Sequence, residues 1–88
     1  MNFNIDVLKK KISYRSTYRG TKEMDLLLSS FVKDIIDDLN QDELIKLLAF
    51  LKLDDENLYK FNQGQNLTIQ IKLNKVSEMF KNYNYASE

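Results

Sequence analysis

The sequence predicts an all-α protein: a small single domain over residues 1–88, built as a bundle of about five helices. The chain contains no proline, the residue that interrupts helices most strongly. It is rich in Leu, Lys, Asp, Glu, Ile and Asn, and apolar residues make up 43% of it, which is enough for one small core. Many of these apolar residues recur three or four positions apart, the period of an amphipathic helix.

The first two helices are predicted on either side of Gly20. One covers about residues 4–17, is capped by Asn4 or Asp6, and carries apolar residues on one face. Gly20 then interrupts the pattern. The second helix covers about residues 21–38 and has a broad apolar stripe. This stripe consists of Met24, Leu27, Leu28, Phe31, Val32, Ile35, Ile36 and Leu39.

The third and fourth helices are predicted from their capping residues. Asn40 followed by Glu43 forms a capping-box pattern, in which each side chain bonds the other residue's backbone N–H, and this helix extends to about Leu51. Asp54 or Asp55 caps a short fourth helix. Its apolar residues are Leu58, Tyr59 and Phe61.

The last part of the chain carries two patterns. Residues 62–66 are predicted as a loop, and Gly64 suits the left-handed position just after a helix. Residues 67–73 then alternate between apolar and polar side chains, as a strand does, whereas residues 73–83 have a helical period. Because a single strand without a partner is not stable, we predict a helix over about residues 67–83.

The chain has no cysteine and no histidine. Their absence removes thiol chemistry, most nucleophile–base pairs and most zinc sites. The acidic runs at residues 37–38 and 54–56 lack the alternating ligand spacing of a calcium-binding loop. We therefore predict that the protein is not an enzyme, has no catalytic residues and binds no metal.

Membrane insertion and secretion are not expected. No apolar run approaches the roughly 20 residues that span a bilayer. Residues 1–6 lack the basic and hydrophobic regions of a secretory signal. We expect a bacterial cytoplasmic protein.

Charge is unevenly distributed along a chain whose net charge is zero. Residues 1–22 carry six basic and one acidic side chain, and residues 23–56 carry three basic and ten acidic. The lysines at positions 9–11, with nearby arginines and tyrosines, are compatible with a nucleic-acid surface, but the acidic middle argues against it. We predict a protein partner with complementary charge, and no nucleic acid.

The segment from Arg15 to Asp25 has the most unusual composition. It holds both arginines of a chain that otherwise uses lysine, and one of its two glycines. Two interpretations fit. In the first, Gly20 caps the second helix, Glu23 at the third helical position bonds back to it, and both arginines are solvated. In the second, both arginines project from one helical face beside Gly20 and form a docking surface with the tyrosines at positions 14 and 18.

Two patches resemble the succinate dehydrogenase assembly factor family (the bacterial SdhE type). The first is Ile12–Asp25, with an aromatic residue, an arginine step, and Arg-Gly-x-x-Glu at residues 19–23. The second is Asp54–Phe61, which is similar to the family's Asp-Asp-Pro-Asp-Leu-Phe-x-Trp stretch. Glu56 replaces the proline, and Phe61 the tryptophan. The order of the patches and the chain length fit as well.

The resemblance implies a five-helix protein that assists covalent attachment of FAD to a histidine of the succinate dehydrogenase flavoprotein subunit, and in some bacteria of fumarate reductase. It also implies that FAD belongs to the partner. We expect that no cofactor is stably bound here and that the factor is monomeric. The residues carried over as partner-binding are Arg19, Gly20, Glu23, Arg15, Tyr14 and Asp25. The alternative is a general helical adaptor with an unrelated partner.

Overall fold

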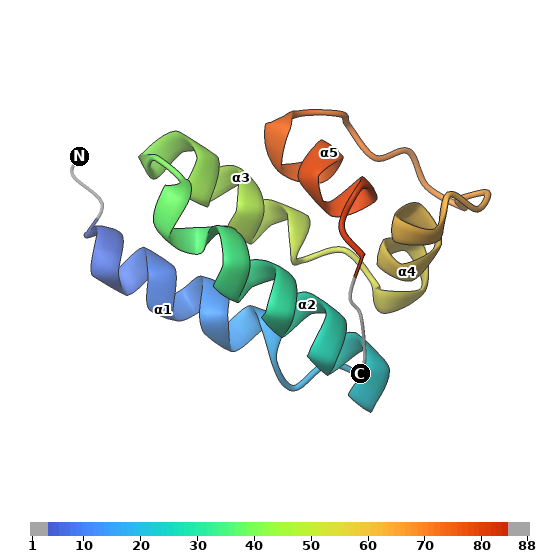
Figure 1. Ribbon diagram of the computed structural model, residues 1–88, viewed down its shortest axis with the longest axis horizontal. Helices are drawn as coiled ribbons and strands as arrows, with labels where there is room; N and C mark the ends of the chain where they lie inside the picture. Colours follow the sequence, from blue (N-terminus) through green and yellow to red (C-terminus); the bar gives the residue numbers. More distant parts are fainter. Residues whose placement is uncertain (1–3, 85–88) are drawn as a thin grey trace.

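The structure is a computed structural model that describes residues 4–84 (Figure 1). Over these residues it contains five α-helices, one 3-10 turn and no strand. They are α1 (Ile5–Ser16), α2 (Lys22–Ile35), η1 (Ile36–Asp38), α3 (Gln41–Phe50), α4 (Asp55–Gln63) and α5 (Lys75–Lys81). The all-α fold with five helices, predicted from the sequence, is confirmed.

Short polar side chains begin each helix at the positions where the sequence carries them. Asn4 accepts from two backbone N–H groups at the start of α1, and Asp54 accepts from Asn57 N at the start of α4. The predicted capping box of Asn40 and Glu43 is present in α3. Gly64 ends α4 with φ of 72°, a left-handed conformation that glycine adopts without steric cost. These local signals explain why the starts of α1, α3 and α4 were predictable.

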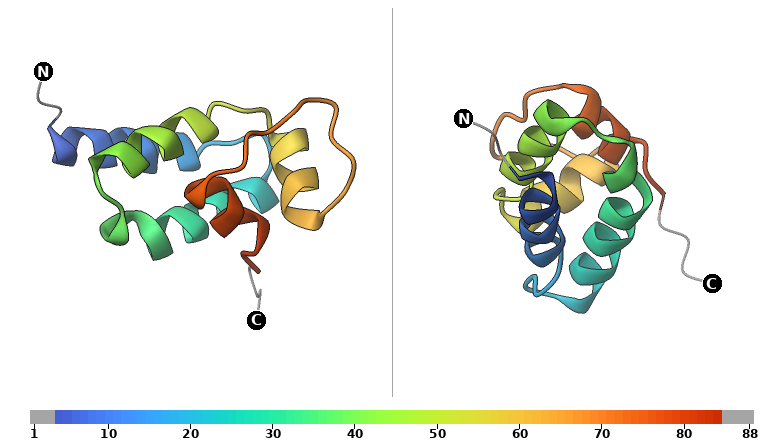
Figure 2. Two further views of the ribbon diagram at one scale, coloured as in Figure 1. Left: turned by 90° about the horizontal axis from the view of Figure 1, so that it is seen from above. Right: turned by 90° about the vertical axis from the view of Figure 1, so that its left-hand side faces the viewer.

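The helices pack in two layers with α4 at one end. Helices α1 and α3 lie side by side, and α2 and α5 lie on the other side of the core (Figures 1 and 2). Within the described part of the chain, no helix is both long enough and apolar enough to cross a membrane.

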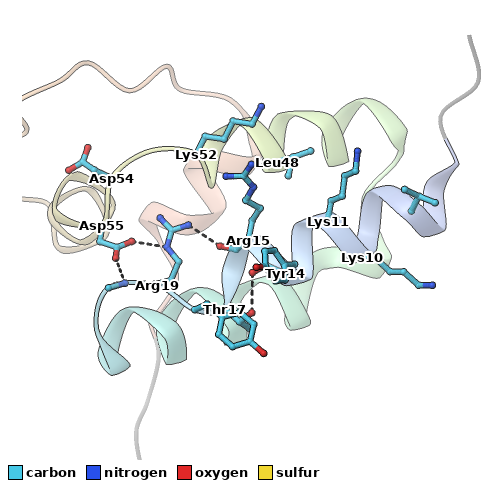
Figure 3. A pocket seen from close by; sticks show the side chains of 13 residues that line it. Lys10, Lys11, Tyr14, Arg15, Thr17, Arg19, Leu48, Lys52, Asp54 and Asp55 are labelled. Carbon is cyan, nitrogen blue, oxygen red and sulfur yellow. Dashed lines mark hydrogen bonds and ion pairs between the residues drawn. The ribbon is translucent and has the colours of Figure 1, made fainter.

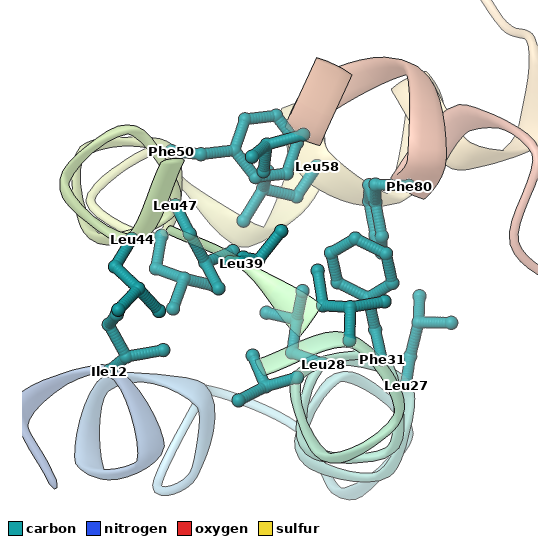
Figure 4. Packing of buried hydrophobic residues seen from close by; sticks show 14 of the residues in the cluster. Ile12, Leu27, Leu28, Phe31, Leu39, Leu44, Leu47, Phe50, Leu58 and Phe80 are labelled. Atoms are coloured by element: carbon teal, nitrogen blue, oxygen red, sulfur yellow. The ribbon is translucent and has the colours of Figure 1, made fainter. Parts of the chain in front are cut away.

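The core is formed by apolar side chains from all five helices (Figure 4). Phe80 of α5 lies at its centre and is fully buried. Its ring packs edge-on against Phe31 of α2, with centroids 4.9 Å apart, and against Phe50 of α3, at 5.5 Å. Edge-to-face aromatic pairs add to the stability gained from burial alone. Phe80 therefore joins the two layers.

The prediction of a helix over residues 67–83 is wrong for residues 67–74. Only Lys75–Lys81 is helical, and a capping box between Asn74 and Ser77 begins that helix. The preceding segment is irregular, and only every second one of its four alternating apolar residues faces the core. Leu67 and Ile71 pack against the core, whereas Ile69 and Leu73 are exposed.

The buried side chain of Asn57 explains this departure. Its amide group donates to Thr68 Oγ1 (2.9 Å), and its oxygen accepts from Thr68 N (3.0 Å). Thr68 comes only four residues after Gly64 at the end of α4, yet it contacts the first turn of that helix. The chain must therefore run back along α4, and an extended backbone covers about twice the length per residue of a helix.

We predict that Asn57→Ala lowers the free energy of unfolding by roughly 1–3 kcal/mol, because it leaves the N–H of Thr68 without its acceptor. Urea denaturation followed by circular dichroism measures this change. Asn66→Ala is the matched control, since Asn66 is exposed and its side chain has no hydrogen bond among the described residues. Equal effects of the two substitutions would contradict this role of Asn57.

Candidate functional site

The connection between α1 and α2 folds against the connection between α3 and α4. Helix α1 ends at Ser16, and the N–H of Thr17 bonds back to Tyr14 O. Tyr18 then adopts a left-handed backbone conformation, with φ of 56°. This conformation is uncommon for a residue other than glycine, and here it turns the chain sharply. The turn carries Arg19 away from the direction of α1.

Arg19 is held inside the protein by four hydrogen bonds. Figure 3 shows those to Asp55 and Arg15. Its Nε bonds Asp55 Oδ1 at 2.7 Å. Its two terminal nitrogens donate to three backbone carbonyls at 2.8–2.9 Å, those of Arg15, Leu51 and Leu53. The side chain is only 11% exposed. A lysine has neither the planar fork nor enough donors in that geometry, so these contacts explain the use of arginine.

We call Arg19, Asp55 and the three carbonyls the clamp. The helix dipoles stabilise both of its charged groups. The carbonyls of Arg15 and Leu51 lie at the ends of α1 and α3, where helix dipoles are negative and a cation is stabilised. Asp55 is the first residue of α4, where the dipole is positive. The clamp therefore places each charge at the helix end that favours it.

Gly20 lies directly against the clamp. Its N–H donates to Asp55 Oδ2 at 2.8 Å. A Cβ built at Gly20 would lie 3.2 Å from the same oxygen, closer than ordinary van der Waals contact. The close approach of Asp55 is thus one reason for a glycine at position 20, and this constraint is set by the chain's own fold and not by a partner.

Two predictions about the start of α2 need correction. Thr21, not Gly20, is the N-cap, and its Oγ1 accepts from Met24 N at 3.2 Å. Glu23 is therefore the second helical residue, and within the described residues its side chain makes no hydrogen bond to the cap. The carboxylate that does bond back is that of Asp25, which accepts from the N–H of Arg19. Glu23 is exposed.

The two arginines do not share a helical face, contrary to the sequence interpretation. Helix α1 ends before Arg19, so the four-residue spacing does not place the two side chains together. Arg15 is exposed and points over α3, whereas Arg19 turns inward to Asp55 (Figure 3). The first interpretation, in which both arginines are solvated, is also wrong, because the Arg19 side chain is only 11% exposed.

Tyr14 and Tyr18 form an exposed aromatic pair beside Arg15. They are 68% and 80% exposed, and their ring centroids are 5.6 Å apart. Tyrosine and arginine are enriched among residues that contribute most to binding at protein interfaces. The two tyrosine rings lie together in the structure, and their use as a docking surface for a protein partner stays a prediction.

The site has the chemistry of a binding surface. There is no histidine or cysteine in the chain. The carboxylate of Asp55 is already bonded on both oxygens. Hydrogen bonds from the side chain and backbone of Asn57 lower the pKa of Asp54, which stays ionised as the cap of α4. In the described residues, no group of three or more potential ligands is placed to hold a metal ion.

Comparison with known protein families identifies the chain. Residues 10–84 match the family described as Sdh5, flavinator of succinate dehydrogenase. The chain belongs to this family. Sdh5 proteins are non-catalytic assembly factors for FAD attachment to the succinate dehydrogenase flavoprotein, and they occur in bacteria and mitochondria. Neither a curated protein nor a solved structure matches the chain.

The match covers both patches on which the resemblance was based, and the structure brings them into contact. Arg19 and Gly20 of the first patch bond Asp55 of the second. Sequence reasoning named Asp55 only as a possible helix cap and missed this role. The available signal was the pair of adjacent aspartates, of which one caps α4 and the other accepts from Arg19. The partner contacts assigned to Arg19, Gly20, Glu23, Arg15, Tyr14 and Asp25 stay a prediction.

We predict that Arg19→Lys lowers the free energy of unfolding by roughly 1–3 kcal/mol, because a lysine cannot bond Asp55 and the three carbonyls together. Arg15→Lys is the matched control. Its side chain is exposed and unbonded among the described residues, so its effect should stay within about 0.5 kcal/mol. Urea denaturation compares the two. Similar values would argue against the clamp.

A second prediction concerns coupling between Gly20 and Asp55. Gly20→Ala should destabilise the native protein because its Cβ crowds Asp55 Oδ2. In an Asp55→Ala background the same change should be neutral or stabilising, since alanine also reduces the entropy of the unfolded chain. A double-mutant cycle in urea should give a coupling energy of about 0.5 kcal/mol or more. An unchanged cost in both backgrounds would show that Gly20 is not required by Asp55.

Proposed function

We propose that this protein contacts the succinate dehydrogenase flavoprotein through the surface around the α1–α2 connection. The family match carries the function, and the exposed Tyr14–Arg15 surface beside the clamp supports the location. In this proposal Tyr14, Arg15, Gly20 and Glu23 touch the partner. Arg19 and Asp25 act from inside the chain, by fixing the backbone on which those residues lie.

The chain contributes positioning to the attachment reaction. It has no histidine, so the acceptor of the flavin belongs to the flavoprotein, as does the FAD. Binding favours a flavoprotein conformation in which the methyl carbon of the flavin lies against that acceptor. A well-oriented reactant pair gains several orders of magnitude in rate from proximity alone. The factor shifts the flavoprotein toward this conformation only if the factor binds this conformation more tightly than it binds the other conformations of the flavoprotein.

The geometry supports a surface that is rigid before the partner arrives. The carbonyl of Arg15 accepts a hydrogen bond from the Arg19 side chain, so the end of α1 is fixed where Tyr14 and Arg15 project. An interface that is already ordered loses less conformational entropy on binding. We further propose that the factor acts as a monomer in a bacterial cytoplasm, and that it serves fumarate reductase where the host makes one.

The test is covalent flavin on the host's succinate dehydrogenase flavoprotein, measured as fluorescence in a denaturing gel. Cells with the intact gene are compared with a deletion strain and with strains that carry Gly20→Arg, Glu23→Ala or Tyr14→Ala with Arg15→Ala. We expect the flavin band to fall strongly in the deletion, in Gly20→Arg and in the double variant. Glu23→Ala should give a smaller loss.

Controls separate contact from folding. Tyr14 and Arg15 are exposed, so their double variant should keep the unfolding midpoint of the native protein. Ile69→Ala with Lys72→Ala is the matched control at two exposed residues between α4 and α5, and it should leave the flavin band unchanged. An undiminished band in the deletion strain would contradict the assembly role in that host and would favour an adaptor with another partner.

A further inference from the structure

A basic groove runs beside the surface described above, between the outer sides of α1 and α3 (Figure 3). Lys11 and Arg15 lie one turn apart on α1, Leu48 lies on α3, and Lys52 lies in the turn that follows the end of α3. The three basic side chains point to the same side, out over Leu48. The groove has a volume of about 910 Å³, which is large enough for several side chains of a partner.

The groove concentrates positive charge in a protein whose net charge is zero. Five basic and two acidic side chains line it. One pair of opposite charges, Arg19 with Asp55, is satisfied internally, and Asp54 is engaged as the cap of α4. Among the described residues, the side chains of Lys10, Lys11, Arg15 and Lys52 have no hydrogen bond or ion pair. Their charge is therefore available to a partner.

Like charges one helical turn apart repel each other, and an anionic partner relieves that repulsion. Lys11 and Arg15 stand in this relation on α1. The groove is also lined by apolar and aromatic side chains, those of Val7, Leu48, Tyr14 and Tyr18. This combination suits a segment that carries both carboxylates and an apolar side chain.

The occupant is a short segment and not a long polyanion. Asp54 and Asp55 lie at the α4 end of the groove, so a phosphate backbone that continued along it would meet acidic side chains. Nucleic-acid binding also favours domains that are basic overall, and this chain is neutral. A protein segment places its carboxylates only where the cations are.

We propose that this groove seats a short acidic segment of the flavoprotein, with its carboxylates on Lys11, Arg15 and Lys52 and an apolar side chain on Leu48. The inference rests on the proposed function, and it extends the partner surface from the α1–α2 connection onto α3. The clamp holds the two walls of the groove together, because Arg19 bonds carbonyls at the ends of both α1 and α3. The seat is therefore formed before binding.

The test uses the double variant Lys11→Glu with Lys52→Glu and the purified flavoprotein subunit, with association and dissociation rates measured at low and moderate salt. Opposed charges across an interface accelerate encounter. Reversal of two of them should slow association by about tenfold or more, and should weaken its dependence on salt. Arg15→Ala should in addition speed dissociation, because it removes a side chain in direct contact.

The matched control is Lys33→Glu with Lys72→Glu, which changes the net charge of the protein by the same amount. Both lysines are exposed, lie outside the groove, and form no ion pair among the described residues. Both double variants are first shown to be folded by their unfolding midpoints. If the control slows association as much as the groove variant, net charge alone is responsible and the proposal is overturned.

Three other outcomes also decide the matter. If the groove variant binds normally while Gly20→Arg still abolishes covalent flavin, the groove proposal fails and the assembly role stands. Titration with free FAD, followed by flavin fluorescence, tests a nucleotide as occupant. Loss of FAD binding in the groove variant, with unchanged flavoprotein association, would overturn an acidic protein segment in favour of the nucleotide. If deletion of the gene leaves covalent flavin intact, the proposed function itself fails.

Discussion

The arrangement of the site depends on the four hydrogen bonds of one buried guanidinium. Arg19 bonds the last turn of α1, the end of α3 and the first residue of α4, and so ties the end of α1 to Leu51 and Asp55, which lie 32 and 36 positions further along the chain than Arg19. A partly buried charge of this kind is stable only when its donors are satisfied, so these elements hold one another in a single relative position. The backbone path around Arg19 then sets three further contacts. The N–H of Gly20 bonds Asp55, the carboxylate of Asp25 accepts from the N–H of Arg19, and Thr21 caps α2.

The same residue explains how far sequence reasoning reached. Helix starts were predicted well because a cap and the N–H groups that it bonds lie within three residues, as in Asn40 with Glu43. The contact between Arg19 and Asp55 spans 36 positions, and that between Asn57 and Thr68 spans 11. Neither has a local signature. The error over residues 67–74 has this origin, since a periodicity argument considers only neighbours along the chain, whereas Asn57 fixes that segment from α4.

The two arginines show why a motif does not by itself assign roles to its residues. They are four positions apart and chemically identical, yet one is exposed beside two tyrosine rings and the other is 11% exposed between two connections. What separates them is the end of α1 at Ser16 and the left-handed turn at Tyr18. The resemblance led to the correct family, but loss of function on substitution of Arg19 would reflect the shape of the surface as much as any direct contact.

An assembly factor without catalytic groups acts through the shape that it presents, and this places a demand on a small protein. A chain of 88 residues buries only about 60–65% of its unfolded surface, so its stability margin is narrow. Exposed tyrosines and unpaired cations add little to that margin, and the role proposed for them is contact with a partner. The clamp contributes both to stability and to the shape of the surface, since the bonds that close the fold between α1, α3 and α4 also order the residues that face outward. If the proposed surface is correct, Arg19 couples stability to recognition, so a substitution there is expected to affect both together, whereas one at the exposed Arg15 is expected to affect recognition alone.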